Sequence, residues 1–396
     1  MIKKIQQDFS YYSHEFKDNY RKGVHRLRTI LASRAQAQAF VSNAGGTAVV
    51  LGYEPSAPDK NAQELYALLT ASPYIDDAVQ TFLGSIYEAG AESQDAMYSD
   101  SARCLEILHD PVMARAAGAG AVSAGKWIAA LAGQSCNLYR DMNAVAASDI
   151  AMTAVAASET AMEAVISGTI ALNAVAASKT AMTAVAANET AMAAVAASRV
   201  AMSAIIGNST ALNAVVTSSV AMAAIIGNST ALNAVVSSQT AMAAVAASQT
   251  AMAAIAASQT AMAAVAASQT AMAAVVASST AMQALYNAAD TTEPILKASS
   301  VAIAAFTAKS TTFSRRGTWG TGLNKPAFML TMKCDYGSIS SNRNFAQCGA
   351  YKLGTTRRQS DSITPNKEMP MYGWVSLVEA YFVDSNYTTT VRYITW

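Results

Sequence analysis

The amino-acid sequence predicts a mainly α-helical protein: a helical N-terminal region, a decapeptide-repeat array of short capped helices, and a small antiparallel β domain at the C-terminal end. Two observations predict the array. Ten residues repeat with an unchanged period from residue 141 to residue 280, and alanine and methionine, which favour helices, dominate the copies. A third observation predicts the β domain, because β-branched and aromatic residues alternate between turn clusters after residue 326.

Residues 1–65 are predicted to form a helical attachment region. The segment KDNYRKGVHRLRTILASRAQAQAF carries most of its charge on one side of a helix, and a loop around Gly45 and Gly46 precedes an apolar, strand-like VVLGY. A basic cluster on this helix fits a docking face for an acidic partner, although a solvated helix face is the simpler interpretation. The cluster consists of Arg21, Lys22, His25, Arg26 and Arg28.

Residues 66–140 are predicted to contain degenerate copies of the helical repeat. Pro73 and Pro111 each follow a residue type that caps helices, and each opens a stretch similar to the later copies. Proline prefers N1, the first position of a helix, so both prolines are predicted to lie there. The neighbouring Asp76 and Asp77 point in different directions on a helix and are expected on the surface.

The decapeptide columns of residues 141–290 indicate helices with one apolar seam. Position two is always Met or Leu, position five is Val or Ile, and position eight is Ser or Asn except at Gly168, in the copies from 141 to 280. A strand would alternate, whereas a Met and a Val three residues apart share one helix face. The columns are therefore predicted to pack neighbouring segments together, as at Met222, Ile225, Met242 and Val245.

Two arrangements are compatible with helical repeats. In one continuous helix each copy would place the methionine stripe about 80° behind the last, and a coiled coil could follow it only by tightening to about 3.3 residues per turn. Ser and Asn at position eight are good N-caps, and Gly207 and Gly227 are predicted to end helices in the left-handed conformation. We therefore expect capped helices of about seven residues wound into a solenoid. The alternative is a long supercoiled helix in a parallel trimer.

The array is nearly free of charge. No Asp, Glu, Lys or Arg occurs between Val200 and Ala289, whereas soluble surfaces carry about a quarter or more charged residues. This stretch is expected either to be covered by Ser, Thr, Gln and Asn or to be buried against other copies. We expect a homo-oligomer, with a trimer favoured.

The C-terminal part is predicted to contain a connector, residues 291–325, and an aromatic-rich β domain, residues 326–396. The connector includes TTFSRRGTWGTGLNKP, and strands are predicted in AFMLTMK, YGWVSLVEAYFV and YTTTVRYITW. Most aromatic residues of so small a domain are expected in its core. Others, together with planar polar side chains in the loops, are candidates for a binding face. This candidate contact face consists of Asn342, Arg343, Tyr351, Arg357, Arg358 and Trp374.

No catalytic, cofactor-binding or metal-binding residue is recognised in the sequence. His14, His25 and His109 are far apart and have no Cys or carboxylate partner at metal-ligand spacing. Phosphate-binding loops, nucleophile elbows and HExxH motifs are missing. We expect a protein that is not an enzyme and uses no cofactor, although a glycosidase would need only two carboxylates.

Charge, hydropathy and cysteine content limit the partners and the compartment. A formal net charge of +1 gives no reason to expect nucleic-acid binding, and no apolar run approaches the roughly 20 residues of a membrane-spanning helix. The polar N-terminus MIKKIQQDFSYYSHEF does not fit a signal peptide. Cys334 and Cys348 could form a disulfide in an oxidising medium, but free thiols in a protein made in the cytoplasm are the favoured interpretation.

The TAMxAVAAS-type decapeptides of residues 141–285, between a helical region and an aromatic β region, resemble the repeats of tail-fibre and tail-appendage proteins of tailed bacteriophages. The resemblance implies a virion protein made in the host cytoplasm. Its N-terminal part would dock on the particle, its repeats would form a shaft, and its distal domain would contact the host surface. The implied partners are other virion tail or neck proteins, further copies of the chain, and a host surface glycan or outer-membrane receptor.

Other functions stay open at this point. No virion-anchoring motif or chaperone-type C-terminal segment is recognised, so the end that faces the particle is not determined. A collar, neck or decoration protein that binds only other virion proteins is the main alternative. A cellular surface adhesin with the repeats as a stalk is a weaker one, because no signal peptide or membrane anchor is recognised.

Overall fold

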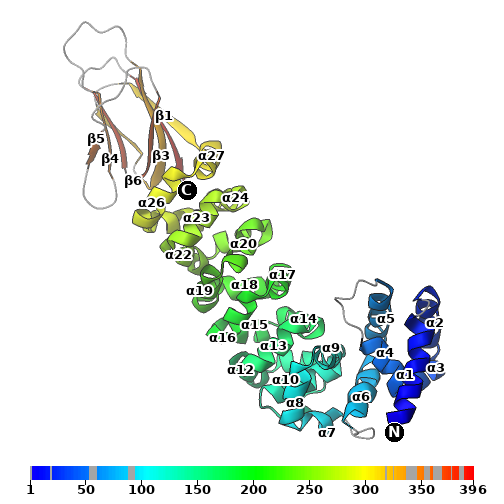
Figure 1. The fold of residues 1–396 in the computed structure, drawn as a ribbon. Helices are drawn as coiled ribbons and strands as arrows, with labels where there is room; N and C mark the ends of the chain where they lie inside the picture. Colours follow the sequence, from blue (N-terminus) through cyan, green and yellow to red (C-terminus); the bar gives the residue numbers. More distant parts are fainter. Residues whose placement is uncertain are drawn as a thin grey trace. The chain divides into compact units, whose positions relative to one another are not determined.

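A computed structural model of the chain describes residues 2–17, 20–52, 60–87, 94–316, 319–323, 325–335, 346–351, 357–359, 368–375, 377–382 and 388–396. The chain forms two compact units, Met1–Val215 and Val216–Trp396. The described residues of the first unit form helices, and those of the second form helices followed by antiparallel strands (Figure 1). The predicted fold class, mainly helical with an array of short helices and a small antiparallel β domain, is confirmed.

The N-terminal part of the first unit is helical, as expected. Its helices are α1 (Ile2–Lys17), α2 (Tyr20–Ala32), α3 (Arg34–Val41), α4 (Ala44–Leu51), α5 (Lys60–Thr70) and α6 (Ile75–Ile86). Helix α1 packs against α2 and α4, and α4 also packs against α6. Helix α4 is therefore covered by more than one neighbour.

The strand expected at VVLGY is wrong, because most of this segment belongs to α4. The N-cap of α4 is Asn43, whose side-chain oxygen accepts a hydrogen bond from the Gly46 backbone nitrogen at 2.8 Å. Val49, Val50 and Leu51 are at most 1% exposed. A helix covered by several neighbours is apolar on most sides, so a short apolar run does not distinguish a helix from a strand.

Between residues 94 and 140, which the structure describes throughout, four further α-helices and a short 3-10 helix precede the array. They are α7 (Gln94–Tyr98), α8 (Ser101–His109), α9 (Pro111–Ala117), α10 (Ala121–Leu131) and η1 (Cys136–Leu138). Pro111 begins α9 behind its N-cap Asp110, as predicted. Pro73 does not occupy the predicted N1 position, because α6 begins at Ile75 behind the N-cap Tyr74.

Asp76 is partly buried, which corrects the prediction that it lies on the surface, whereas Asp77 is exposed. The N-cap of α10 is Gly120, which has no side chain to cap the helix. The Asp76 carboxylate takes this role from another helix, since its Oδ1 accepts a hydrogen bond from the Ser123 backbone nitrogen at 2.9 Å. A Cβ atom on Gly120 would lie 2.1 Å from the same oxygen, so this close approach requires glycine.

The array is built from helices of mostly nine residues. Most begin at position nine of one decapeptide and end at position seven of the next, as α12 does with nine residues, whereas α11 begins at Met142 and α17 ends at Ile206. At most of the bends only the residue at position eight separates consecutive helices, so the predicted length of about seven residues is too short. The array helices are α11 (Met142–Ala147), α12 (Asp149–Ala157), α13 (Glu159–Ser167), α14 (Thr169–Ala177), α15 (Lys179–Ala187), α16 (Glu189–Ala197), α17 (Arg199–Ile206), α18 (Ser209–Thr217), α19 (Ser219–Gly227), α20 (Ser229–Ser237), α21 (Gln239–Ala247), α22 (Gln249–Ala257), α23 (Gln259–Ala267), α24 (Gln269–Ala277) and α25 (Ser279–Asn287).

Consecutive array helices bend sharply and stack in turns. In the first unit, the bend between α12 and α13 is 100°, and in the second unit the bend between α21 and α22 is 98°. Helix α12 packs against both α15 and α16, and α21 packs against both α24 and α25. Each unit therefore contains a solenoid with between three and four helices per turn (Figure 1). The alternative of one long supercoiled helix is wrong.

The bends use an extended residue and not a left-handed glycine. Ser238 has φ −96° and ψ 119°, and Ser248 has φ −93° and ψ 119°. Gly207 has φ −77° and ψ −8°, in the right-handed helical region, and Gly227 is the last residue of α19. The predicted left-handed conformation of these two glycines is wrong, and among the glycines that the structure describes only Gly133 has a positive φ, 72°.

Most of the predicted connector is regular structure, because residues 291–325 contribute to two helices and two strands. The elements that follow the array are α26 (Ala289–Ala298), α27 (Ser300–Lys309), β1 (Thr311–Arg316), β2 (Trp319–Leu323), β3 (Ala327–Asp335), β4 (Ala346–Tyr351), β5 (Arg357–Gln359), β6 (Met369–Val375), β7 (Leu377–Phe382) and β8 (Thr388–Thr395). The predicted strand segments coincide with β3, with β6 and β7 together, and with β8.

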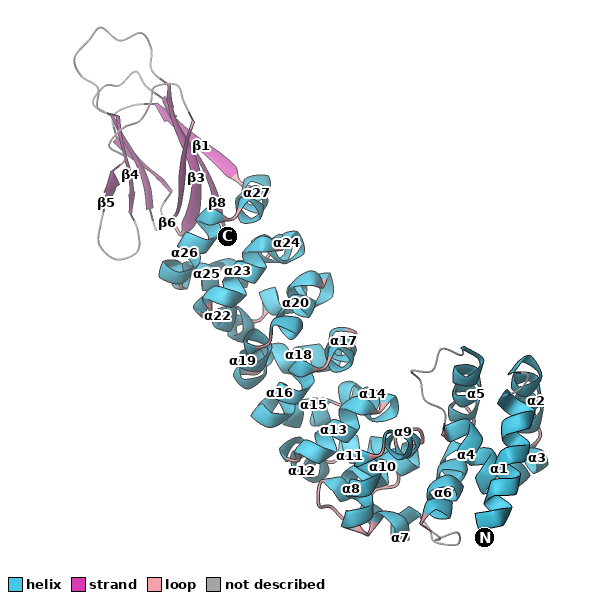
Figure 2. Ribbon diagram, in the orientation of Figure 1, coloured by secondary structure: helices cyan, strands magenta, loops and turns pink. Residues whose placement is uncertain are grey.

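In the described residues, eight strands form two antiparallel sheets, ordered β1-β8-β3-β6 and β2-β7-β4-β5. This is the strand order of a jelly roll, in which eight strands form two sheets through two Greek keys. The first sheet packs on α26 and α27 through β3, β6 and β8 (Figure 2). Its buried side chains include Phe328, Leu330, Trp374 and Val391.

Candidate functional site

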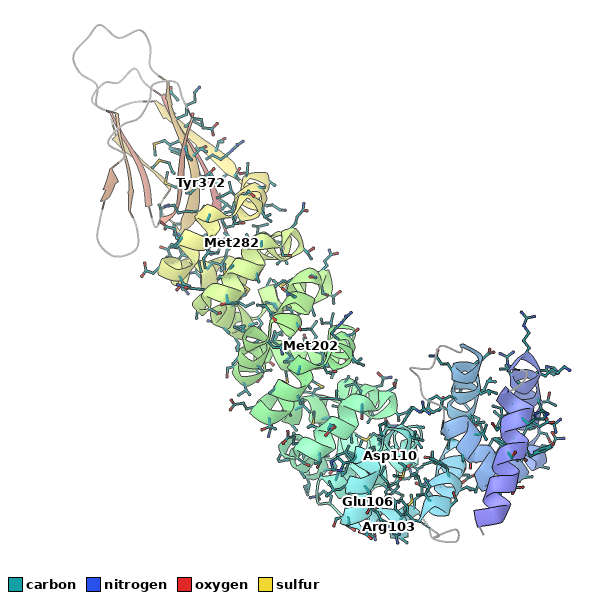
Figure 3. The ribbon with its side chains drawn as sticks, viewed as in Figure 1. Arg103, Glu106, Asp110, Met202, Met282 and Tyr372 are labelled. Carbon is teal, nitrogen blue, oxygen red and sulfur yellow. The ribbon has the colours of Figure 1, made fainter. Side chains whose placement is uncertain are left out.

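The apolar seam of the array lies inside the solenoid. The predicted seam residues Met222, Ile225 and Val245 are each 1% exposed, and Met242 is 0% exposed. Every methionine of the column, from Met142 to Met282, is at most 1% exposed. Figure 3 labels two of them, Met202 in the first unit and Met282 in the second, and both lie among the stacked helices. Position two therefore fills the space between neighbouring helices.

Several of the position-eight serines form a joint between turns of the solenoid. In the second unit, the Ser268 hydroxyl accepts a hydrogen bond from the Ala271 backbone nitrogen at 3.2 Å, which caps α24. The same hydroxyl donates to the Val236 carbonyl oxygen at 2.7 Å, in α20, four helices earlier than α24. In the first unit, Ser178 makes the same pair of contacts. One side chain therefore caps a helix and holds it to the turn below.

The basic cluster of the N-terminal region is exposed and partly paired with acids. The Arg26 Nε atom lies 2.9 Å from a carboxylate oxygen of Glu15, and Arg28 forms an ion pair with Glu64. Arg21, Lys22 and His25 are also exposed. Exposed ion pairs contribute little to stability, about 0–1 kcal/mol each, so this face stays available to solvent and to partners.

Trp374 lies at the centre of the junction between the jelly roll and the helices. It is 1% exposed and contacts the rings of Phe306, Phe328 and Tyr286, with ring centroids 6.2, 4.9 and 6.0 Å away. Its backbone nitrogen donates to Glu293 Oε2 at 3.1 Å, and its indole Nε1 donates to Thr292 Oγ1 at 3.0 Å. The expectation that Trp374 belongs to an exposed contact face is wrong, because the helices cover it.

The other members of the candidate contact face are only partly located. Asn342 and Arg343 lie outside the described residues. Tyr351 belongs to β4, and Arg357 and Arg358 belong to β5. The antiparallel register of these strands places Tyr351 opposite Arg357, so three of the six residues come from one pair of strands. Their side chains lie outside the described part of the chain.

The junction residues were missed in the sequence, although a signal marks them. The copy AMQALYNAAD is the first without Val or Ile at position five and without Ser, Asn or Gly at position eight, and it also carries Gln283, Tyr286 and Asn287. Tyr286 packs against Trp374 and Trp396, with ring centroids 6.0 and 5.7 Å apart. Departure from an otherwise uniform repeat marks the place where the array meets a different surface.

The surface of each unit has a groove between its helices. One of about 810 Å³ in the first unit is lined by α5, α9, α13 and α14, and includes Tyr66, Arg115 and Glu163. Arg115 is engaged in holding the fold, since its guanidinium lies 4.8 Å from the Tyr66 ring centroid and donates to the Leu51 carbonyl oxygen at 2.6 Å. Burial raises the pKa of Tyr66. A second groove, of about 400 Å³, lies between α22 and α25 in the second unit.

Within the described residues, no group of three or more His, Cys, Asp or Glu side chains could hold a metal ion. Cys104 and Cys136 are free and buried, and burial raises the pKa of the Cys104 thiol to about 12. The side chains of Cys334 and Cys348 lie outside the described part. No single helix there has the length and hydropathy to cross a membrane, although six bent helix pairs meet both requirements when each pair is taken together.

No protein-family model matches the chain, and no curated protein matches its sequence. The class of protein is therefore defined by its architecture. It is a decapeptide-repeat α-solenoid whose last helices carry a jelly-roll domain.

Proposed function

We propose that the chain is a structural protein of a bacteriophage virion, a tail fibre or tail appendage. Its N-terminal helices dock on the particle, its array serves as a spacer, and its jelly roll contacts the surface of the host cell. The observation that carries the proposal is the junction at Trp374, where a uniform repeat array is fastened to a jelly roll through buried side chains. Jelly rolls occur in viral capsid and lectin domains, so this domain suits both assembly and surface recognition.

The array suits a spacer better than a catalyst. Each copy adds a similar helix, a buried Met or Leu, a buried Val or Ile, and a short bend, so the number of copies changes the length of the array but adds no new chemistry. A single position-eight residue between helices leaves little room for bending, unlike a flexible linker. We therefore propose a protein that is not an enzyme, needs no cofactor and resides in the virion.

Self-association is part of the proposal. The stretch between Val200 and Ala289 has no charged residue, and its exposed positions carry mostly Ala, Ser, Thr, Gln and Asn. An uncharged surface of this extent favours association with other copies over wide separation in solution. We propose a homo-oligomer, with a trimer favoured, that also binds other tail or neck proteins. Light scattering of the purified chain measures the number of copies, and a strict monomer at high concentration would contradict this part.

A collar, neck or decoration protein is the second candidate. The jelly roll favours it independently, because capsid subunits use the same fold to bind other virion proteins. In that case both ends of the chain bind virion components, and neither contacts the host.

Deletion of residues 311–396 from the chain in the encoding virus separates the two candidates. The deletion must begin at Thr311, because β1 pairs with β8 and a cut at residue 326 would leave an unpaired strand. Intact particles that no longer adsorb to host cells would support the fibre, and failed assembly would support the collar protein. Particles with Gln269→Ala, a substitution of an exposed array residue, serve as the control. If the chain is not found in purified virions by mass spectrometry, both candidates are wrong.

A further inference from the structure

The groove between α22 and α25 has an uncharged lining of amide, hydroxyl and alanine side chains. It measures about 400 Å³, and its polar lining residues are Gln249 of α22 and Thr280, Gln283 and Asn287 of α25, with alanines completing the surface. Gln249, Gln283 and Asn287 are exposed, so their amides are accessible to a ligand. The volume falls in the range of about 300–1,000 Å³ that is usual for small-molecule sites.

The residues that distinguish this groove break the repeat. Gln283 and Asn287 occupy positions three and seven of their decapeptide, and in the four copies from 241 to 280 both positions are alanine. In the neighbouring pair of stacked helices, α21 and α24, the equivalent residues are Ala273 and Ala277 of α24. These residues offer no hydrogen-bonding side chain. The two amides therefore distinguish α25 from these four copies.

A chain of hydrogen bonds orients the two amides. The Trp396 indole Nε1 donates to Gln283 Oε1 at 3.2 Å, and Gln283 Nε2 donates to Asn287 Oδ1 at 2.8 Å. Each Gln and Asn amide has two N–H donors and an acceptor oxygen, so both retain donors after these bonds form. The half-buried Trp396 ring, which orients Gln283 in this chain of hydrogen bonds, is itself packed against Tyr286, with centroids 5.7 Å apart.

We propose that this groove binds a neutral saccharide. A pyranose ring presents adjacent hydroxyl groups, which pair with the donors and acceptors of planar amides, and a face of C–H groups, which packs on apolar side chains such as the alanines of this lining. The lining contains no Lys or Arg that would select a phosphate or a sugar acid and no carboxylate that would select an amino sugar. The proposal rests on these residues alone and does not depend on the proposed virion function.

The test is saturation-transfer NMR on the full chain with four probes: glucose, galactose, N-acetylglucosamine and glucuronic acid. We expect saturable binding of at least one neutral probe and weaker binding of glucuronic acid. Gln249→Ala and Asn287→Ala, which change opposite walls of the groove, should each weaken binding at least tenfold. Gln269→Ala changes a Gln of the same type on α24, outside the groove, and should leave binding unchanged.

Gln283 contacts Trp396, so its replacement affects the stability of the fold as well as the groove. The melting temperature separates these two effects. Gln283→Ala removes that contact and is expected to lower both the melting temperature and the binding, whereas Asn287→Ala should lower only the binding. The proposal is overturned if no neutral probe binds the unaltered chain, or if binding survives both Gln249→Ala and Asn287→Ala. Loss of host adsorption plays no part in this test, so its outcome is separate from that of the proposed function.

Discussion

The side chain at position eight shows how much of this fold is decided by single residues. Its N-cap role is predictable from sequence, because Ser and Asn are preferred at N-caps and recur every ten residues. Its second role is not predictable, because the hydroxyl of Ser268 reaches the carbonyl of Val236 in another turn. Asp76 is a similar case, since its partner, the Ser123 backbone nitrogen, belongs to a helix far along the chain.

Replacement of a single seam methionine tests the packing at residue scale. Met242→Ala should lower the free energy of unfolding by about 2–5 kcal/mol, because a fully buried side chain leaves a cavity. Met242→Leu should cost less than about 1.5 kcal/mol, since Leu172, Leu212 and Leu232 occupy the same column naturally. Urea unfolding measures both. Equal losses for the two variants would show that side-chain volume at this position does not matter.

Asp76 gives the fold a dependence on pH. Burial raises its pKa above the ordinary value of 3.8, although hydrogen bonds from the Ser123 and Val122 backbone act in the opposite direction. The folded state therefore binds the proton more tightly than the unfolded state. The stability that this adds is complete below pH 3.8 and is lost as the pH rises through the raised pKa.

Asp76→Asn provides the comparison. The variant keeps an acceptor for Ser123 but does not titrate, so the unaltered chain should lose stability relative to it as the pH rises from about 3.5 to 7. Asp76→Ala removes the acceptor and should cost about 1–2 kcal/mol at neutral pH. Urea unfolding across this pH range measures both effects. Parallel curves for the unaltered chain and Asp76→Asn would mean that the carboxyl does not change its pKa on folding.

At the scale of elements, the sequence predicts the helices and strands that carry a repeating local pattern. It does not predict the elements whose conformation depends on contacts with distant parts of the chain. The strands β3 and β8 carry a pattern of β-branched and apolar residues of their own, and both were predicted. The strands β1 and β2 were assigned to a connector, because their glycines and basic residues resemble a loop. They become strands by pairing with β8 and β7, more than fifty residues later in the chain.

The joint between solenoid turns can be tested by separating its two hydrogen bonds. The Ser248 hydroxyl caps α22 and donates to the Val216 carbonyl. Ser248→Asn keeps the cap, as Asn228 does naturally, and should cost about 1 kcal/mol for the bond to the carbonyl. Ser248→Ala loses both bonds and should cost about 2 kcal/mol. Thermal or urea unfolding gives the two values, and equal costs would exclude a contribution from the bond between turns.

At the scale of the whole molecule, the period predicts a repeat architecture, and the structure confirms a solenoid. The same period does not reveal the order of strands in the C-terminal domain, which depends on pairings between segments far apart in sequence. The prediction of the candidate contact face was wrong at Trp374 for the same reason, because burial also depends on contacts between distant segments. Trp374 is aromatic and lies in a strand, and only the packing of α26 and α27 on that strand shows that it is buried.

Removal of one complete repeat tests the architecture. Deletion of residues 241–250 joins two copies in the same register, since residues 251–260 differ from the deleted ones only by Ile in place of Val. The shortened chain should keep its helical circular-dichroism signal and a cooperative thermal transition, at a modestly lower temperature. Deletion of residues 241–245 removes half a copy and displaces the methionine column, so it should abolish the transition. If both deletions behaved alike, register would not govern the stacking.

The joints between turns also determine how such a protein responds to mechanical load. A tension applied along a coil of this kind acts on the weak lateral attachments, which are buried apolar side chains and, at several turns, a hydroxyl hydrogen bond, before it strains any covalent bond. The coil would then open gradually, and each decapeptide pulled straight would release about 35 Å of contour. Such a chain would absorb work during a sudden pull and rewind when the load falls, which an inextensible rod cannot do.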